Sequence, residues 1–172
     1  MAATLVETMG KETEFVIKPM ETPEEMDGKG YVHWKSWHET YASLTGAVYL
    51  ERITLEKCKE NARCWSENTL VAKSGDKVVG FLCYGKSNEL PDCGEVYALY
   101  VLRECHGTQI GYQLMNAAME QIREYSKVNL WVLQGNERAI RFYERYGFRF
   151  DGTSAEIMMG RQNTKLRMVY ER

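Results

Sequence analysis

The sequence predicts a single α/β domain with a central mixed, mostly antiparallel, twisted sheet flanked by helices. The chain has 172 residues, of which 44% are hydrophobic, and this supports one sizeable core. Apolar runs alternate with helical patterns between residues 96 and 147, which indicates parallel strand neighbours. A loop at residues 74–76 contains Gly and joins two further apolar runs, which indicates an antiparallel hairpin. We expect the domain to cover residues 14–172, after a flexible N-terminal tail at 1–13.

Two helices are predicted in the N-terminal third. Because Gly28 and Gly30 interrupt the pattern before it, the first helix is expected to begin at Tyr31, and Gly46 is expected to end it. Thr54 is a suitable N-cap for the second helix. The apolar stripe of this second helix is expected to contain Leu55, Cys58, Ala62 and Trp65.

The rest of the chain alternates between strands and helices. A long helix is expected at residues 109–125, and a second one runs from the cap Asn136 to a stop at Gly147. The buried stripe of the long helix is expected to contain Ile110, Leu114, Ala117, Ala118 and Ile122. Strands are expected at residues 15–17, 69–73, 77–85, 96–102, 128–133, 148–150 and 166–170, with a polar loop between the last two.

Composition argues against several classes of protein. The formal net charge of −2 and the pI near 6.0 do not favour a nucleic-acid binder, which would usually be basic. No apolar run approaches the ~18 residues of a membrane span. The first 14 residues lack the basic and apolar regions of a signal peptide. We therefore expect a cytoplasmic protein that needs neither a membrane nor a nucleic acid.

The cysteine and histidine residues indicate no metal site and no disulfide framework. The five Cys are odd in number and contain no C-x-x-C pair, so reduced thiols are expected. The three His are His33, His38 and His106, and none has a partner at metal-ligand spacing. We expect no metal cofactor.

The segment from Glu95 to Tyr112 is predicted to bind a phosphate group. It reads as an apolar strand, a turn containing Gly107 and Gly111, and the start of a helix. A helix N-terminus at such a turn presents free backbone N–H groups to an anion. The turn is not a Walker A loop, because Tyr112 follows Gly111 where Lys is required. It also lacks the third Gly of a dinucleotide fingerprint.

Two stretches carry a resemblance to a known family. Residues 106–111, after a strand that ends at Val101, resemble the acyl-CoA loop of the Gcn5-related N-acetyltransferase (GNAT) family, which reads Arg or Gln, two residues, Gly, one residue, Gly or Ala. His106 and Gln109 depart from that pattern. Residues 130–148 resemble the second family signature, with its Asn, Ala, Phe-Tyr and Gly-Phe filled by Asn136, Ala139, Phe142, Tyr143, Gly147 and Phe148. The predicted order of elements matches the family along nearly the whole chain.

The resemblance implies a GNAT fold and transfer of an acetyl group from acetyl-CoA to a primary amine of a small molecule or peptide. It implies direct nucleophilic attack without a covalent enzyme intermediate, and a possible homodimer. A backbone N–H near Tyr100 or Val101 is expected to stabilise the oxyanion. Asn136 contacts the pantetheine arm or only caps its helix. The positions expected to bind coenzyme A are Leu99, Tyr100, Val101, His106, Gly107, Thr108, Gln109, Ile110, Gly111, Tyr112 and Asn136.

Two residues are candidates for catalysis by the same resemblance. Glu95 would accept the proton of the amine through an ordered water, and Tyr143 would donate a proton to the leaving thiolate. Each has a plainer alternative. Glu95 can be a solvated residue at a strand start, and Tyr143 can be a core residue, because it also lies on an apolar helix stripe. The acceptor site is expected to involve Trp34, Trp37, His38 and Tyr41, although an aromatic stripe of this spacing is more often core.

Two other functions remain open from the sequence. A non-catalytic acyl-CoA sensor or scaffold module would keep the loop and lose the chemistry. A route through an acyl-enzyme would use Cys93 or Cys105 as nucleophile, but no His and Asp constellation supports it.

Overall fold

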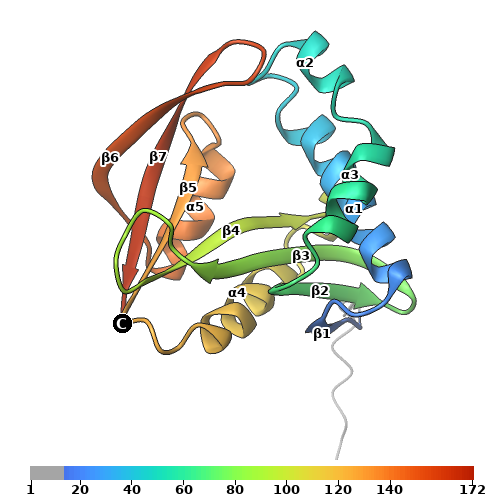
Figure 1. The fold of residues 1–172 in the computed structure, drawn as a ribbon, viewed down its shortest axis with the longest axis horizontal. Coiled ribbons are helices and arrows are strands. Elements are labelled where there is room, and N and C mark those ends of the chain that lie inside the picture. Colours follow the sequence, from blue (N-terminus) through green and yellow to red (C-terminus); the bar gives the residue numbers. More distant parts are fainter. Residues whose placement is uncertain (1–13) are drawn as a thin grey trace, which may run out of the picture.

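The structure, a computed structural model, describes residues 14–172, and the predicted tail at 1–13 lies outside them (Figure 1). One seven-stranded sheet has the order β1-β2-β3-β4-β5-β7-β6, and only β4 and β5 are parallel. This confirms the predicted fold class, a mixed and mostly antiparallel sheet in one α/β domain. The strands are β1 Val16–Pro19, β2 Thr69–Ser74, β3 Lys77–Lys86, β4 Cys93–Val101, β5 Lys127–Leu133, β6 Arg149–Met158 and β7 Gln162–Glu171.

Helices cover both faces of the sheet. In Figure 1, α1 and α3 lie across one face of β3, and α4 lies under the other face. The main apolar cluster forms between α4 and the sheet, around Leu82, Leu114 and Met168, which are all completely buried. The helices are α1 Pro23–Thr40, α2 Ala47–Glu51, α3 Leu55–Cys64, the 3₁₀ turn η1 Arg103–Cys105, α4 Ile110–Gln121 and α5 Glu137–Tyr146.

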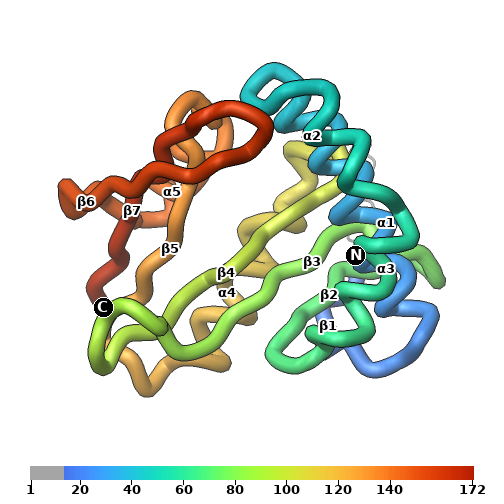
Figure 2. The backbone as a smooth tube through the Cα atoms, turned by 45° about the horizontal axis from the view of Figure 1, so that its top comes forward, coloured from blue at the N-terminus to red at the C-terminus, as the bar shows by residue number. Residues whose placement is uncertain are grey.

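Strands β4 and β5 diverge along their length. They pair over only four residues each, Cys93–Val96 with Lys127–Leu130. Beyond that point β4 stays with β3 as far as Val101, while β5 stays with β7 as far as Leu133. Figure 2 shows the two halves of the sheet separating from this junction. The carboxyl ends of two parallel strands therefore lie apart, which is where α/β sheets commonly bind ligands.

The prediction that α1 begins at Tyr31 is wrong, because the helix starts at Pro23 and runs through both glycines. A capping box of Thr22 and Glu25 starts it. Gly28 and Gly30 serve close packing instead of a break. A Cβ on Gly28 would lie 2.7 Å from Val78 Cβ, and a Cβ on Gly30 would lie 2.6 Å from the Lys59 Cα. The helix also ends at Thr40, before Gly46, and the short α2 follows.

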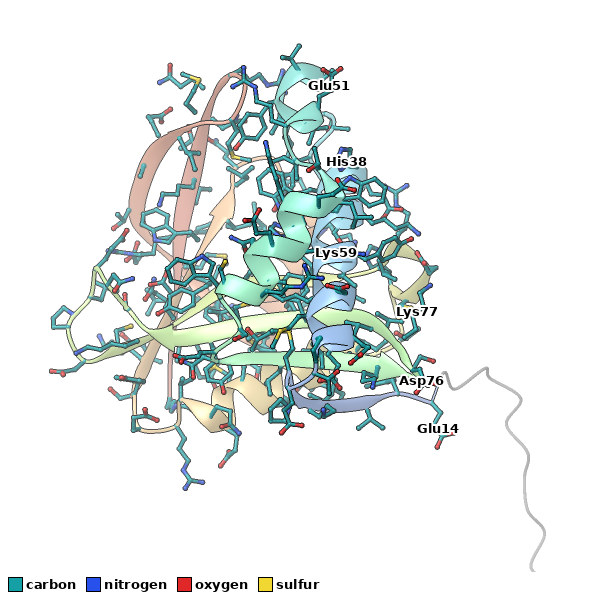
Figure 3. All side chains as sticks on the ribbon, turned by 45° about the vertical axis from the view of Figure 1, so that its right-hand side comes forward. Glu14, His38, Glu51, Lys59, Asp76 and Lys77 are labelled. Atoms are coloured by element: carbon teal, nitrogen blue, oxygen red, sulfur yellow. The ribbon has the colours of Figure 1, made fainter. Side chains whose placement is uncertain are left out.

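Three smaller expectations also fail. The polar loop expected between the last two strands is instead a long β6–β7 hairpin, which apolar alternation did not reveal because much of it is exposed. The loop between β2 and β3 has two residues, since Ser74 pairs with Lys77 (Figure 3 labels Asp76 in this loop and Lys77 at the start of β3). Trp65 is 72% exposed, because α3 ends one residue before it.

Candidate active site

A cavity of about 1020 Å³ opens where β4 and β5 diverge. Its walls come from α1, β4, the turn before α4, β5, α5 and the β6–β7 hairpin. Twelve of the residues predicted for the site line it: Trp37, Tyr41, Leu99, Tyr100, Val101, His106, Gly107, Gln109, Gly111, Tyr112, Asn136 and Tyr143. Five others do not, namely Trp34, His38, Glu95, Thr108 and Ile110. A volume of this size is at the top of the ~300–1,000 Å³ range of small-molecule sites.

The turn before α4 has the conformation of an anion-binding loop. Gly107 has φ +80° and open space around its missing Cβ, and Gln109 is left-handed at φ +67°. Gln109 is the N-cap of α4, and its side chain makes no capping hydrogen bond. The N–H groups of the first turn of α4 therefore have no side-chain acceptor, and they face the cavity mouth at Gly111 and Tyr112.

Basic side chains gather beside this loop. His106 Nε2 lies 2.9 Å from Val101 O and 2.9 Å from Arg138 Nη1. Burial lowers the pKa of His106, so the ring is neutral at pH 7. Arg103 and three arginines on one side of α5 also line the cavity: Arg138, Arg141 and Arg145. The three-to-four spacing of the α5 arginines was the available sequence signal for this cluster.

Strand β4 offers two backbone N–H groups to the cavity. Leu102 donates its N–H to Val79 O on β3 at 2.9 Å. Because antiparallel ladders alternate, the N–H of Tyr100 also faces β3, and the N–H groups of Leu99 and Val101 face the side that β5 has left. Of the two positions predicted for the oxyanion, Val101 thus has the suitable orientation.

Tyr143 lies on α5 at the cavity wall and is only 8% exposed. Its ring packs edge-on against Phe142 and Phe148. Burial, together with neighbouring Tyr41, raises the pKa of Tyr143 above its ordinary value. The hydroxyl is therefore protonated at neutral pH. Asn136 begins the same helix, and its Oδ1 accepts a hydrogen bond from Ala139 N at 3.3 Å, so its capping role is observed.

Glu95 lies on β4 at the junction with β5, just below the cavity lining. Its side chain is half-buried, and burial raises the pKa of this carboxyl, although hydrogen-bonding contacts from Ser87 and Asn129 oppose the shift. Glu95 pairs with Asn129 across the parallel ladder, so both side chains project from the same face of the sheet. Asn129 is completely buried, and its side chain lies close enough to Glu95 to act on that pKa, although its Nδ2 makes no hydrogen bond of standard geometry among the described residues.

The aromatic residues of α1 divide between the cavity and the outside of the helix. Trp37 donates from Nε1 to Tyr100 Oη at 3.0 Å, and both line the cavity with Tyr41. Trp34 packs instead against His38 with the two rings tilted and their centroids 5.2 Å apart, and neither residue lines the cavity. Figure 3 labels His38 on α1. Because Trp37 and Tyr41 line the cavity, they are better placed than Trp34 and His38 to contact an acceptor.

The wall opposite α1 contains residues that the sequence pattern does not single out. Trp131 on β5, Lys165 on β7, and Ile157 and Met159 around the end of β6 all line the cavity. Lys165 Nζ lies 4.1 Å from the centre of the Trp131 ring. No sequence signal pointed to the hairpin residues, because the segment had the composition of a loop.

Three further features concern metal ligands, membrane-spanning helices and cysteines. Within residues 14–172, no three His, Cys, Asp or Glu side chains come together as a metal-binding group. No helix in the same range is long and apolar enough to cross a bilayer. All five cysteines are free thiols.

Comparison with known proteins identifies the fold family. The sequence profile of the Acetyltransferase (GNAT) family matches residues 32–148, which is more than half of the chain. The chain belongs to the GNAT acetyltransferase family. The profile spans the site from α1 to the end of α5, so it includes both GNAT signatures. A curated relative from Archaeoglobus fulgidus, an uncharacterized N-acetyltransferase, is 34% identical over 122 residues, covering 64% of this chain and 80% of the relative.

Solved structures show the same GNAT fold. The PaiA N-acetyltransferase of Thermoplasma acidophilum, solved in complex with coenzyme A, superposes with a TM-score of 0.71 at 20% identity, covering 92% of this chain and 99% of that one. The yncA acetyltransferase structure from Salmonella typhimurium, solved with acetyl-CoA, superposes with a TM-score of 0.68 at 15% identity, covering 92% and 94%. At these identities the likeness establishes the fold.

Proposed function

We propose that this GNAT protein transfers an acetyl group from acetyl-CoA to a primary amine by direct attack. The observation that carries the proposal is the cavity at the β4–β5 divergence. It connects a helix N-terminus with free N–H groups to Tyr143 and to the sheet face that bears Glu95. Two structures with this fold were solved with coenzyme A and with acetyl-CoA, which supports the same donor here.

The donor would lie with its diphosphate at residues 106–112 and its thioester near Tyr143. The N–H groups of the α4 first turn would donate hydrogen bonds to the diphosphate oxygens, and Arg103 and Arg138 would add charge-assisted contacts. The N–H of Val101 would donate to the thioester oxygen as negative charge develops there.

The chemistry then requires the nitrogen to lose two protons and the sulfur to gain one. Glu95 would take the first proton from the ammonium through a water that the buried Asn129 Nδ2 helps to hold, and pass it to solvent. The neutral nitrogen attacks the thioester carbon, and the C–N bond forms with a tetrahedral oxyanion. Collapse of the oxyanion breaks the C–S bond, and the second nitrogen proton leaves by the same route. Tyr143 would donate its proton to the departing sulfur and regain one from solvent.

The cysteines do not support a covalent route. Cys93 is buried, and burial raises the pKa of its thiol. Cys105 lines the cavity, but burial and Glu104 raise the pKa of this thiol as well. A nucleophilic cysteine usually has a lowered pKa. These environments favour direct attack.

Replacing Tyr143 tests the proposal. Tyr143→Phe should lower kcat about 100-fold with little change in the affinity for acetyl-CoA, because general acid catalysis is worth roughly 10²–10⁴ in rate. Thiol release across an amine panel gives kcat, and calorimetry gives the affinity. Tyr125→Phe, outside the cavity, is the control.

The same measurements separate the two candidate functions. Equal turnover of the Tyr143→Phe and parent proteins would contradict the role of Tyr143. Tight binding of coenzyme A by the parent, with no thiol released over any amine, would instead favour the non-catalytic acyl-CoA sensor.

A further inference from the structure

One wall of the cavity carries a cation that has no counter-charge. Lys165 lines the cavity, and no carboxylate of residues 14–172 lies within ion-pair distance of its Nζ. Its neighbour Arg167 differs, because Arg167 is paired with Asp151 at 2.7 Å and Glu89 at 3.6 Å. Lys165 is therefore the basic group of β7 that remains available to a ligand.

The surroundings of Lys165 also lack an acceptor. Its Nζ lies over the Trp131 ring, at 4.1 Å from the centroid. The indole N–H of Trp131 is buried and has no hydrogen-bond partner in the described part of the chain. Ile157 and Met159, which line the same wall, are apolar. A half-buried ammonium thus lies beside a buried indole N–H that has no acceptor, although buried donors are normally paired.

This cation lies on the same sheet face as the proposed base. Glu95 pairs with Asn129, and Trp131 is two residues further along β5, so all three side chains project from one face. Lys165 pairs with Leu133, two residues beyond Trp131, and its side chain reaches back so that Nζ lies over the Trp131 ring. A carboxylate and an ammonium on one face of the sheet match the two ends of a small amine that also carries an anionic group.

The cavity is bridged on the hairpin side. Arg161, in the β6–β7 turn, donates from Nε to Leu44 O at 2.8 Å and also bonds Ser43 O. Gly160 packs against Tyr49 of α2, where a Cβ would lie 2.7 Å from Tyr49 Cβ. Figures 1 and 2 show the hairpin reaching the α1–α2 region. This bridge limits the space for a protein substrate and favours a small acceptor.

We propose, on the basis of the acetyltransferase function above, that the acceptor is a small primary amine bearing a carboxylate, such as a free amino acid, and that Lys165 binds the carboxylate. The Arg167 guanidinium lies over the same Trp131 ring at 5.7 Å from the centroid, but Asp151 and Glu89 already balance its charge. A single unpaired ammonium suits a monoanion better than a phosphate dianion, which would call for further donors. Lys165 is thus a specificity-determining residue.

The test uses matched acceptors that differ in one group. Free amino acids and their carboxamides are compared by thiol release from acetyl-CoA. The parent protein should show kcat/KM at least about tenfold higher for the carboxylate member of a pair. Lys165→Met should abolish that preference by lowering kcat/KM for the acid and not for the amide, and Lys165→Arg should retain most of it. Lys86→Met, exposed on β3 outside the cavity, should keep the parental preference.

Four results would overturn the inference. The first is that the parent protein has the same kcat/KM for the amides as for the acids, and the second is that Lys165→Met keeps the parental preference. The third is a loss of coenzyme A affinity in Lys165→Met, measured by calorimetry, which would place Lys165 at the donor. The fourth is that only peptides and proteins are acetylated. In each case the acetyltransferase function survives. Absence of thiol release with every amine overturns that function, and this inference with it.

Discussion

At the scale of single residues, Gln109 explains why the loop tolerates a departure from the family pattern. The position is left-handed at φ +67°, which is the conformation that favours Gly there. A residue with a Cβ costs roughly 1–2 kcal/mol in this region. Gln109 keeps the backbone geometry and leaves the α4 N–H groups without a side-chain cap. The free N–H groups, rather than the Gly itself, are what an anion requires.

Glu95 gives a prediction about pH. Burial raises the pKa of its carboxyl, and a general base works only when deprotonated. Activity should therefore be present above that raised pKa and fall as the pH is lowered through it. Glu95→Gln should lower kcat/KM roughly 100-fold at neutral pH and remove this acidic limb.

Full pH profiles of kcat/KM for the parent and Glu95→Gln proteins check the assignment of Glu95 as the base. Both profiles are measured with the same acceptor, because titration of the acceptor amine then affects them equally. Glu120→Gln, exposed on α4 and paired with Arg123, is the control. An unchanged acidic limb in Glu95→Gln would assign the base elsewhere.

At the scale of elements, α1 shows how packing overrides local propensity. A Cβ on Gly30 would lie 2.6–2.8 Å from atoms of Lys59, two of them backbone, so α3 cannot easily move aside. Gly30→Ala gains up to ~1 kcal/mol of helix propensity but should still lower the free energy of unfolding by about 1–3 kcal/mol, the usual cost of overpacking. Denaturant unfolding of the parent and Gly30→Ala proteins measures this difference in free energy.

Gly46→Ala is the matched control for that prediction. Gly46 has φ −75° and no atom within 4 Å of an added Cβ, so the change should cost less than about 1 kcal/mol. A Gly30→Ala protein as stable as the parent would mean that the α1–α3 contact is not tight.

The same elements show what sequence can and cannot predict. The two signatures predicted α4, β5 and α5 well, because turn, cap and stop residues such as Asn136 and Gly147 act locally. The glycines of α1 were misread because their reason is Lys59 and Val78, which are distant in sequence. Lys165 was missed because its relation to Trp131 exists only after β7 pairs with β5. Local chemistry is readable in sequence, and long-range juxtaposition is not.

At the scale of the whole molecule, the cavity separates two parts of one sheet. Strands β1–β4 with α1–α4 form one part, and β5–β7 with α5 form the other. The described sheet joins them through the four-residue β4–β5 ladder, and side-chain contacts such as His106–Arg138, Asn116–Tyr146 and the Arg161 bridge add to it. A ligand that fills the cavity contacts both parts. It should therefore stabilise the whole fold and not one half.

Coenzyme A should raise the free energy of unfolding by about 2.7 kcal/mol at 100 times its Kd, because it binds only the folded chain.

Gly107→Ala should weaken that gain, since Gly107 has φ +80° at the diphosphate loop. Gly75→Ala is the matched control: Gly75 also has positive φ, +57°, and open space, but lies in the β2–β3 turn outside the cavity. Both variants should lose about 1 kcal/mol without ligand. Denaturant unfolding with and without coenzyme A distinguishes them. Equal ligand-induced gains for Gly107→Ala and Gly75→Ala would show that the diphosphate binds elsewhere, and no gain in the parent would remove the donor from this cavity altogether.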